Sequence, residues 1–439
     1  METETGGLPL HDLQETWSWL TADDRREGFA LLGRPDAEEF FLGLSARDQA
    51  PVLFGLPPGE RRGFARLLAP DDAAELLRWL DAPQRATLLD LLDEPTRKEV
   101  SALLAYAEDA AGGLMNPRYA RVRPEMTVDE AISYLRRQSR EQLETIYYAY
   151  VLDNDQKLLG VTSFRDLFKS QPQRPIREVM KTQLITIPEH LDQEELGRMF
   201  QRAGLLALPV VDAEGRMKGV VTVDDVVGVV AQEATEDIQK MGGSESLGEP
   251  YLAIRFRDMI KKRAGWLAAL FLGEMLTATA MGFFEHEIAK AVVLALFVPL
   301  IISSGGNSGS QATTLVIRAM ALGEVRLRDW WRVMRREIGS GLALGSILAV
   351  IGFTRILVWQ MAAKVYGEHW MKVALTVAFS LVGVVTFGTL TGSLLPFILR
   401  RLGFDPASAS APVVATMLDL SGVLIYFTLA QELLRGRLL

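Results

Sequence analysis

The chain has 439 residues, no cysteine and a formal net charge of −8 at pH 7. The lack of cysteine excludes disulfides, thiol catalysis and zinc sites built on thiolates. Residues 1–250 carry a net charge of −16, whereas the more apolar residues 251–439 carry +8. An acidic part joined to a basic, apolar part argues against nucleic-acid binding and favours a soluble module attached to a membrane domain.

Residues 1–112 have the pattern of short helices. Leu, Phe and Trp recur at three- and four-residue spacing between Pro and Gly residues, and segments such as Ala69–Leu77 and Leu89–Pro95 repeat loosely. This pattern predicts an acidic N-terminal domain in which short α-helices stack as a superhelix. Asp71 and Asp72 fall at a predicted helix start, where the simplest role of a carboxylate is to cap the helix.

Residues 113–173 and 174–232 are two copies of one unit. Val151–Phe168 aligns with Val210–Val227, and each copy predicts a strand, an Asp-containing turn, a second strand and a helix that opens at Ser163 or Thr222. The repeat resembles a tandem pair of CBS domains, which are α/β domains built from βαββα units. In that family the Ser/Thr-x-x-Asp element can contact the ribose of a nucleotide. Simple N-capping and ligand contact therefore both stay open for Ser163 and Thr222.

Residues 233–262 are predicted to form a connecting helix and a linker. Glu233, Glu236 and Asp237 would lie within one helical turn, where like charges repel unless a cation lies between them. A solvated run of charge is the alternative interpretation.

Residues 263–439 are predicted to form a membrane domain with five α-helical spans, near 264–284, 288–317, 338–360, 372–399 and 410–434. Basic residues precede the first span and lie in the loops that join the second to the third and the fourth to the fifth. The positive-inside rule then places the N-terminus in the cytosol and the C-terminus outside.

The second span contains a run of polar and small residues. From Ser303 to Gln311 it consists almost entirely of Gly, Ser and Asn. Polar groups at membrane depth need a partner or water, and small residues let helices approach closely. The density of the run favours a conduction path, with tight helix packing as the alternative.

Two carboxylates are expected inside the membrane. Asp419 falls about nine residues into the fifth span, roughly 13 Å along the helix at about 1.5 Å per residue. A buried carboxylate needs a cation, a proton or a partner such as Arg355, and we favour a cation site. Glu274 in the first span could line the path, join a polar helix contact or bind protons.

The available ligand types favour Mg²⁺. Thiols are absent and the four His residues are scattered, which argues against a soft transition metal, whereas carboxylate, amide and backbone oxygens suit Mg²⁺. The sequence has no nucleophile–base set and no phosphate-cradling Gly-Lys motif, so we do not expect an enzyme.

The order of these domains resembles the MgtE family of magnesium channels. The motifs that carry the resemblance are Tyr106-Ala-Glu-Asp-Ala-Ala-Gly-Gly-Leu-Met, Glu233-Ala-Thr-Glu-Asp-Ile, Gly305-Gly-Asn-Ser-Gly-Ser-Gln, and Phe404-Asp-Pro-Ala together with Asp419. The resemblance implies a homodimer in membrane lipid, with a pore between the membrane halves and Asp419 of each subunit at the main ion site, near Asn307, Gly306 and Ala415. It also implies a cytosolic Mg²⁺ sensor with the candidate ligands Asp192, Glu194, Asp225, Glu233, Glu236, Asp237 and Asp72. ATP binding at the CBS pair would involve Asp166 and the backbone near Leu184.

We therefore predict a multidomain, dimeric, Mg²⁺-selective channel of the inner or plasma membrane that takes up Mg²⁺ and is closed by cytosolic Mg²⁺. One alternative is a proton- or sodium-coupled divalent cation transporter or exporter that uses Glu274 and Asp419 together. Another is a CBS-regulated membrane receptor without transport.

Overall fold

The computed structural model describes residues 10–138, 143, 147–252, 254–290 and 292–434, and it divides into two compact units, Met1–Ala231 and Gln232–Leu439. Each unit is described by itself below. The division falls inside a single helix, α14, which runs from Val223 to Met241. The domain boundaries expected from the sequence stay a prediction.

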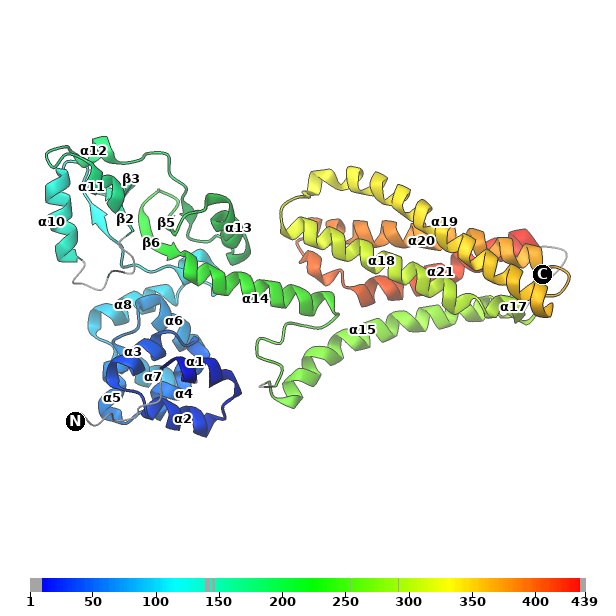
Figure 1. Ribbon diagram of the computed structural model, residues 1–439, viewed down its shortest axis with the longest axis horizontal. Coiled ribbons are helices and arrows are strands. Elements are labelled where there is room, and N and C mark those ends of the chain that lie inside the picture. Colours follow the sequence, from blue (N-terminus) through cyan, green and yellow to red (C-terminus); the bar gives the residue numbers. More distant parts are fainter. Residues whose placement is uncertain (1–9, 139–142, 144–146, 253, 291, 435–439) are drawn as a thin grey trace. The chain divides into compact units, whose positions relative to one another are not determined.

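The N-terminal part of the first unit is built from short helices (Figure 1). Several of them begin after an N-cap residue whose side chain accepts a backbone N–H, as at Thr21, Ser45 and Asp93. Their apolar faces bury a shared core that includes Phe41 and Phe64. The bounds are α1 Leu10–Thr16, η1 Trp17–Trp19, α2 Ala22–Ala30, α3 Arg34–Leu42, α4 Ala46–Gly55, α5 Pro58–Ala65, α6 Pro70–Trp79, α7 Ala82–Leu91, α8 Glu94–Leu103 and α9 Ala111–Leu114.

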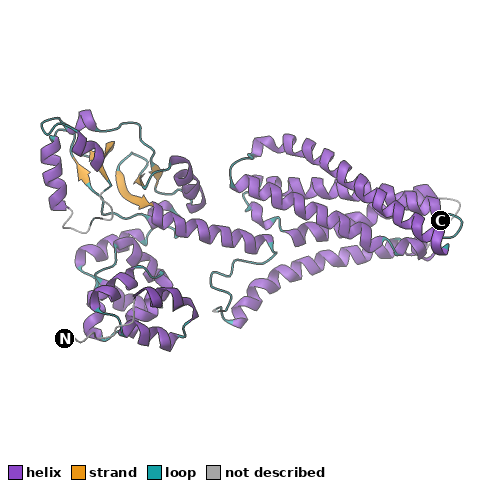
Figure 2. Ribbon diagram, in the orientation of Figure 1, coloured by secondary structure: helices purple, strands orange, loops and turns teal. Residues whose placement is uncertain are grey.

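Two small sheets follow, one for each copy of the repeat (Figure 2). The strand orders are β1-β2-β3 and β4-β5-β6, and in each sheet the first pair is parallel and the second antiparallel. Both antiparallel pairs also carry a register shift at the equivalent place, after Val151 and after Val210. The predicted tandem α/β repeat is confirmed. The bounds are β1 Arg121–Val122, α10 Val128–Gln138, β2 Tyr148–Leu152, β3 Leu158–Ser163, α11 Phe164–Lys169, α12 Ile176–Val179, β4 Ile187–Pro188, α13 Gln193–Ala203, β5 Ala207–Val211 and β6 Met217–Thr222.

The second unit contains five helices that are long and apolar enough to cross a membrane, as the sequence predicts. α18 packs against α20 and α21, α19 packs on α20, and α15 lies along α21 (Figure 1). The second predicted span, 288–317, is wrong at both ends, because the continuous helix begins at Val298 and ends at Ala321. Pro299 sits in the first turn of that helix, where its missing N–H is tolerated. The bounds are α15 Phe256–Phe283, α16 Glu285–Lys290, α17 Val292–Ala295, α18 Val298–Ala321, η2 Leu327–Asp329, α19 Trp330–Ala363, α20 Trp370–Arg401, η3 Pro406–Ser408 and α21 Ala411–Leu434.

Candidate ion path and cation-sensing sites

The Gly/Ser run of α18 is helical throughout, and one of its faces is a packing surface. A Cβ added at Gly388 of α20 would lie 2.6 Å from the carbonyl oxygen of Gly305, and one at Gly392 would lie 2.1 Å from that of Gly309. Thr313 ties the same helices together, because its hydroxyl donates to the Gly392 carbonyl at 2.8 Å. Tight helix packing therefore explains Gly305 and Gly309.

The neighbouring face of α18 meets α21. A Cβ added at Gly306 would lie 3.8 Å from the Cα of Ala415, and Asn307, the next residue, is exposed on the single chain. Asp419 follows Ala415 by one helical turn and is partly buried. Two of the residues predicted for the ion path, Gly306 and Ala415, are thus brought together one turn before Asp419, and Asn307 follows Gly306 on α18.

The structure gives Asp419 a partner that was not expected. In the described part of the chain Arg355 forms no ion pair with Asp419, and its guanidinium lies instead over the ring of Phe297, 5.8 Å from the centroid. The carboxyl groups of Asp419 and Glu274 face each other at close range. The Thr416 hydroxyl donates to Glu274 Oε1 at 3.4 Å, so α15 brings a second carboxylate to this face of α21.

The close approach of α15 to α21 depends on a glycine. A Cβ added at Gly273, beside Glu274, would lie 2.6 Å from Cγ2 of Thr416. The sequence contained both carboxylates but no signal for their contact, since 144 positions separate Glu274 from Asp419.

An acidic contact joins the N-terminal domain to the second CBS repeat. Burial raises the pKa of Asp72 on α6 to about 6, and the charges of Glu75 and Asp224 add to the effect. Burial also raises the pKa of Asp225 to about 6, with repulsion from Asp224 and Asp72, although the Thr222 hydroxyl donates to its Oδ2 at 2.7 Å. Two predicted sensor ligands from distant parts of the sequence therefore lie near each other.

Asp71 and Asp72 both lie in the first turn of α6, as predicted, and the backbone N–H of Ala69 donates to the Asp72 carboxylate. The N-cap of α6 is Ala69, which makes no side-chain cap hydrogen bond. Asp71 is buried and accepts a hydrogen bond from the Asn116 side chain at 3.0 Å, whereas Asp72 lies in the acidic contact described above. Asp72 therefore keeps a capping contact and also faces the second CBS repeat, whereas a tertiary hydrogen bond holds Asp71.

Other predicted sensor residues are already bonded within the chain. Asp192 caps α13 and accepts the N–H of Glu194 at 2.8 Å, while the Glu194 carboxylate pairs with Arg198. In the second unit, Glu236 Oε1 lies 2.5 Å from Lys240 Nζ, and the same Nζ lies 2.6 Å from Oδ2 of Asp405.

Glu233 and Asp237 are partly buried on α14. Among the described residues no three acidic or histidine side chains converge as a metal site.

The predicted nucleotide residues come from both repeats, Asp166 from the first and Leu184 from the second. The Ser163 hydroxyl donates to Asp166 Oδ2 at 2.7 Å and accepts the N–H of Asp166 at 3.1 Å, so Ser163 caps α11. The hydrogen bond from Ser163 and the nearby charge of Lys181 lower the pKa of Asp166. Lys181 pairs through its backbone with Val161, and Leu184 follows three residues later.

Comparison with known proteins supports the same organisation. Family profiles match the MgtE intracellular N domain at residues 8–109, CBS domains at 111–172 and 176–232, and the MgtE divalent cation transporter domain at 298–429. The magnesium transporter MgtE of Thermus thermophilus is 42% identical over 338 residues, which are 77% of this chain and 73% of that protein. The chain belongs to the MgtE family.

A second curated relative agrees with this assignment. The MgtE magnesium transporter of Enterococcus faecalis is 32% identical over 77% of this chain and 72% of that protein. A crystal structure of the cytosolic domain of the Mg²⁺ channel MgtE in complex with ATP covers 51% of this chain and 90% of that one, with 41% identity and a TM-score of 0.47. Membership of a transporter family confirms the expectation that the chain is not an enzyme.

Proposed function

We propose that this MgtE protein carries Mg²⁺ across the inner or plasma membrane as a channel that cytosolic Mg²⁺ closes. The observation that carries the proposal is the 42% identity to a magnesium transporter over 77% of the chain. The close arrangement of Gly306, Ala415 and Asp419 supports a path along α18 and α21. A carboxylate at membrane depth attracts a divalent cation, while an amide and backbone oxygens leave room for its bound water.

A second copy of the chain would complete the path. Asn307 and Glu274 are polar residues of membrane-spanning helices, yet both are exposed on the single chain. Polar side chains at membrane depth need water or a polar partner, and the facing surface of a second subunit would supply both. In this arrangement the N-terminus is cytosolic, the C-terminus lies outside and the ion path runs between the two subunits.

Repulsion between carboxylates supports gating by cytosolic Mg²⁺. At neutral pH the Asp72–Asp225 contact carries ionised groups that burial disfavours. Bound Mg²⁺ would neutralise them and favour the closed contact, which gives the ligand the differential affinity that a conformational shift requires. α14 begins two residues before Asp225 and ends at Met241, so it would transmit the closing of the Asp72–Asp225 contact toward the membrane helices.

The test is Mg²⁺ flux into proteoliposomes at a fixed driving force, with the Mg²⁺ on the cytosolic side varied. We expect flux that shuts off as this Mg²⁺ rises, and loss of flux in Asp419→Asn. Glu324→Gln removes an exposed carboxylate from the loop after α18 and is the matched control, with flux unchanged. Full flux in a folded Asp419→Asn protein would refute the assigned path.

The facing carboxylates of Glu274 and Asp419 favour a second candidate, coupled transport of a divalent cation with protons or sodium ions. Flux that requires a pH or Na⁺ gradient, and that loses this requirement in Glu274→Gln, would establish it. Flux without any imposed gradient in both proteins would exclude it.

We also propose ATP binding at the CBS pair as a modulating contact, through Asp166 and the backbone near Leu184. Asp166→Asn should weaken ATP binding, which isothermal titration of the full chain would measure.

A further inference from the structure

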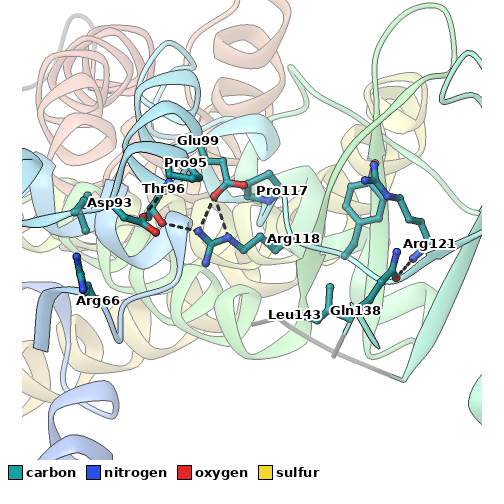
Figure 3. A pocket seen from close by; sticks show the side chains of 12 residues that line it. Arg66, Asp93, Pro95, Thr96, Glu99, Pro117, Arg118, Arg121, Gln138 and Leu143 are labelled. Atoms are coloured by element: carbon teal, nitrogen blue, oxygen red, sulfur yellow. Dashed lines mark hydrogen bonds and ion pairs between the residues drawn. The ribbon is translucent and has the colours of Figure 1, made fainter. Parts of the chain in front are cut away.

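A cavity of about 850 Å³ lies in the first unit between the N-terminal domain and the first CBS repeat (Figure 3). One wall is formed by Arg66, which follows α5, and by the first turns of α8. The other wall is formed by the segment that leads into β1 and by Gln138 at the end of α10. Its volume lies in the range of small-molecule sites, about 300–1,000 Å³.

The carboxylates that line this cavity are already bonded. Glu99 pairs with Arg118, whose Nε and Nη2 lie 2.9 and 2.8 Å from Glu99 Oε2. Arg118 Nη2 also donates to the Thr96 hydroxyl at 2.6 Å. Asp93 caps α8 and accepts the N–H of Thr96 at 3.2 Å, and hydrogen bonding to Thr96 holds its pKa below the usual range. These bonds fix α8 against the segment before β1, and the nearby charge of Arg66 lowers the pKa of Asp93 further.

The groups that remain without partners are donors. In the described part of the chain the guanidinium groups of Arg66 and Arg121 make no hydrogen bond or ion pair. Gln138 is only 8% exposed, and its Oε1 accepts the backbone N–H of Arg121 at 3.1 Å. Its amide nitrogen makes no hydrogen bond to the described residues and is a further donor at this wall.

We propose that this cavity binds a small anion that carries a chain of phosphate groups. Guanidinium groups bind phosphate oxygens in a two-pronged geometry, and a buried amide donor adds orientation. Arg66 and Arg121 lie at opposite ends of the cavity (Figure 3), so the ligand must reach both. Because one arginine belongs to the N-terminal domain and the other to the first CBS repeat, the bound chain would join the two domains. Asp166 and Leu184 do not line the cavity, so this site is separate from the proposed ATP contact.

The test is isothermal titration of the full chain in detergent with inorganic tripolyphosphate, in a buffer of low ionic strength without Mg²⁺. We expect saturable binding that weakens about tenfold in Arg66→Gln and in Arg121→Gln, which corresponds to about 1.4 kcal/mol each. Arg62 lies on α5, the helix that Arg66 follows, but it does not line the cavity. Arg62→Gln is therefore the matched control and should bind like the parent. Asp166→Asn should also bind like the parent.

A second arm identifies the source of the phosphate chain. ATP that competes with tripolyphosphate indicates a nucleoside triphosphate, whereas tripolyphosphate binding without competition indicates an inorganic chain, and both results support the site.

If a Gln variant fails to fold, Arg66→Lys and Arg121→Lys are used instead. They keep the charge but lose the two-pronged geometry, and they should bind tripolyphosphate more weakly than the parent. Absence of binding, equal affinity in all cavity variants, or an equal loss in Arg62→Gln would overturn the proposal. None of these results depends on ion flux, so the proposed transport is tested separately.

Discussion

The acidic contact between Asp72 and Asp225 predicts a stability effect of unusual sign. Removal of the Asp225 charge by Asp225→Asn should stabilise the contact at neutral pH without Mg²⁺. The reason is that both carboxylates have a pKa raised to about 6 in the folded chain, against an ordinary value of 3.8. A group with a raised pKa contributes stability below about pH 4, and this stability is lost as the pH rises through about 6.

The structure sets the magnitude. A pKa of about 6 instead of 3.8 corresponds to about 3 kcal/mol for ionising Asp225 in the folded state. The Asp225 side chain is partly exposed, and solvent screening reduces the figure to about 1–2 kcal/mol. At pH 7.5 the Asn variant should therefore be more stable by this amount, and at pH 4.5 most of the difference should disappear. Mg²⁺ should stabilise the parent chain more than the variant at pH 7.5.

Hydrogen–deuterium exchange of the α6 amides, corrected for pH, gives the free energy of opening of this contact. Asp166→Asn is the matched control, because Asp166 occupies the equivalent position in the first repeat. Its pKa is lowered by the Ser163 hydrogen bond, so its contribution is present at neutral pH and is lost as the pH falls. The control should show no gain at pH 7.5. An Asp225→Asn gain that is as large at pH 4.5 as at pH 7.5 would refute the electrostatic explanation.

Three further predictions concern packing and ion pairs. Gly392→Ala should destabilise the membrane domain by about 2 kcal/mol in thermal unfolding, because its Cβ would meet a carbonyl oxygen, whereas Gly282→Ala has open space and should not. Lys240→Gln and Asp405→Asn should show a coupling of only about 0.5–1 kcal/mol in a double-mutant cycle by hydrogen exchange, since the pair is partly exposed and salt should weaken it further. Asn116→Ala should cost about 2 kcal/mol in unfolding of the first unit, because the side chain is buried and donates to a buried carboxylate; a neutral result would contradict that role.

The features predicted correctly from the sequence are those with a local period. Alignment of Val151–Phe168 with Val210–Val227 identified the repeat, and helical spacing with Pro and Gly breaks identified the short N-terminal helices. Uninterrupted apolar length identified five membrane helices, although Pro299 made the second begin later than expected. In each case the signal and the structure it specifies lie within about twenty residues.

The candidate sites depend on contacts between distant residues, and these could not be predicted. The sequence predicts Glu236 within a helical turn of like charges, and no signal indicates the ion pairs that Lys240 forms with Glu236 and with Asp405. Ser163 and Thr222 occupy equivalent positions in the two repeats, yet the aspartates that follow them have pKa shifts in opposite directions. At Asp166 the hydrogen bond from Ser163 is the main cause and the charge of Lys181 adds to it, whereas at Asp225 burial outweighs the hydrogen bond from Thr222 and the charge of Asp72 raises the pKa further.

The Gly/Ser run of α18 shows why packing and conduction need not be alternatives. Successive residues of an α-helix are rotated by about 100°, so Gly305 and Gly306 face different neighbours. Gly305 and Gly309 let α20 approach to backbone contact, which fixes α18 firmly. Gly306 then faces α21 and Asn307 lies on the open face. Both residues have little freedom to move. A rigid packing face is therefore a condition for an ion path on the adjacent face, because Mg²⁺ tolerates little variation in its ligand geometry.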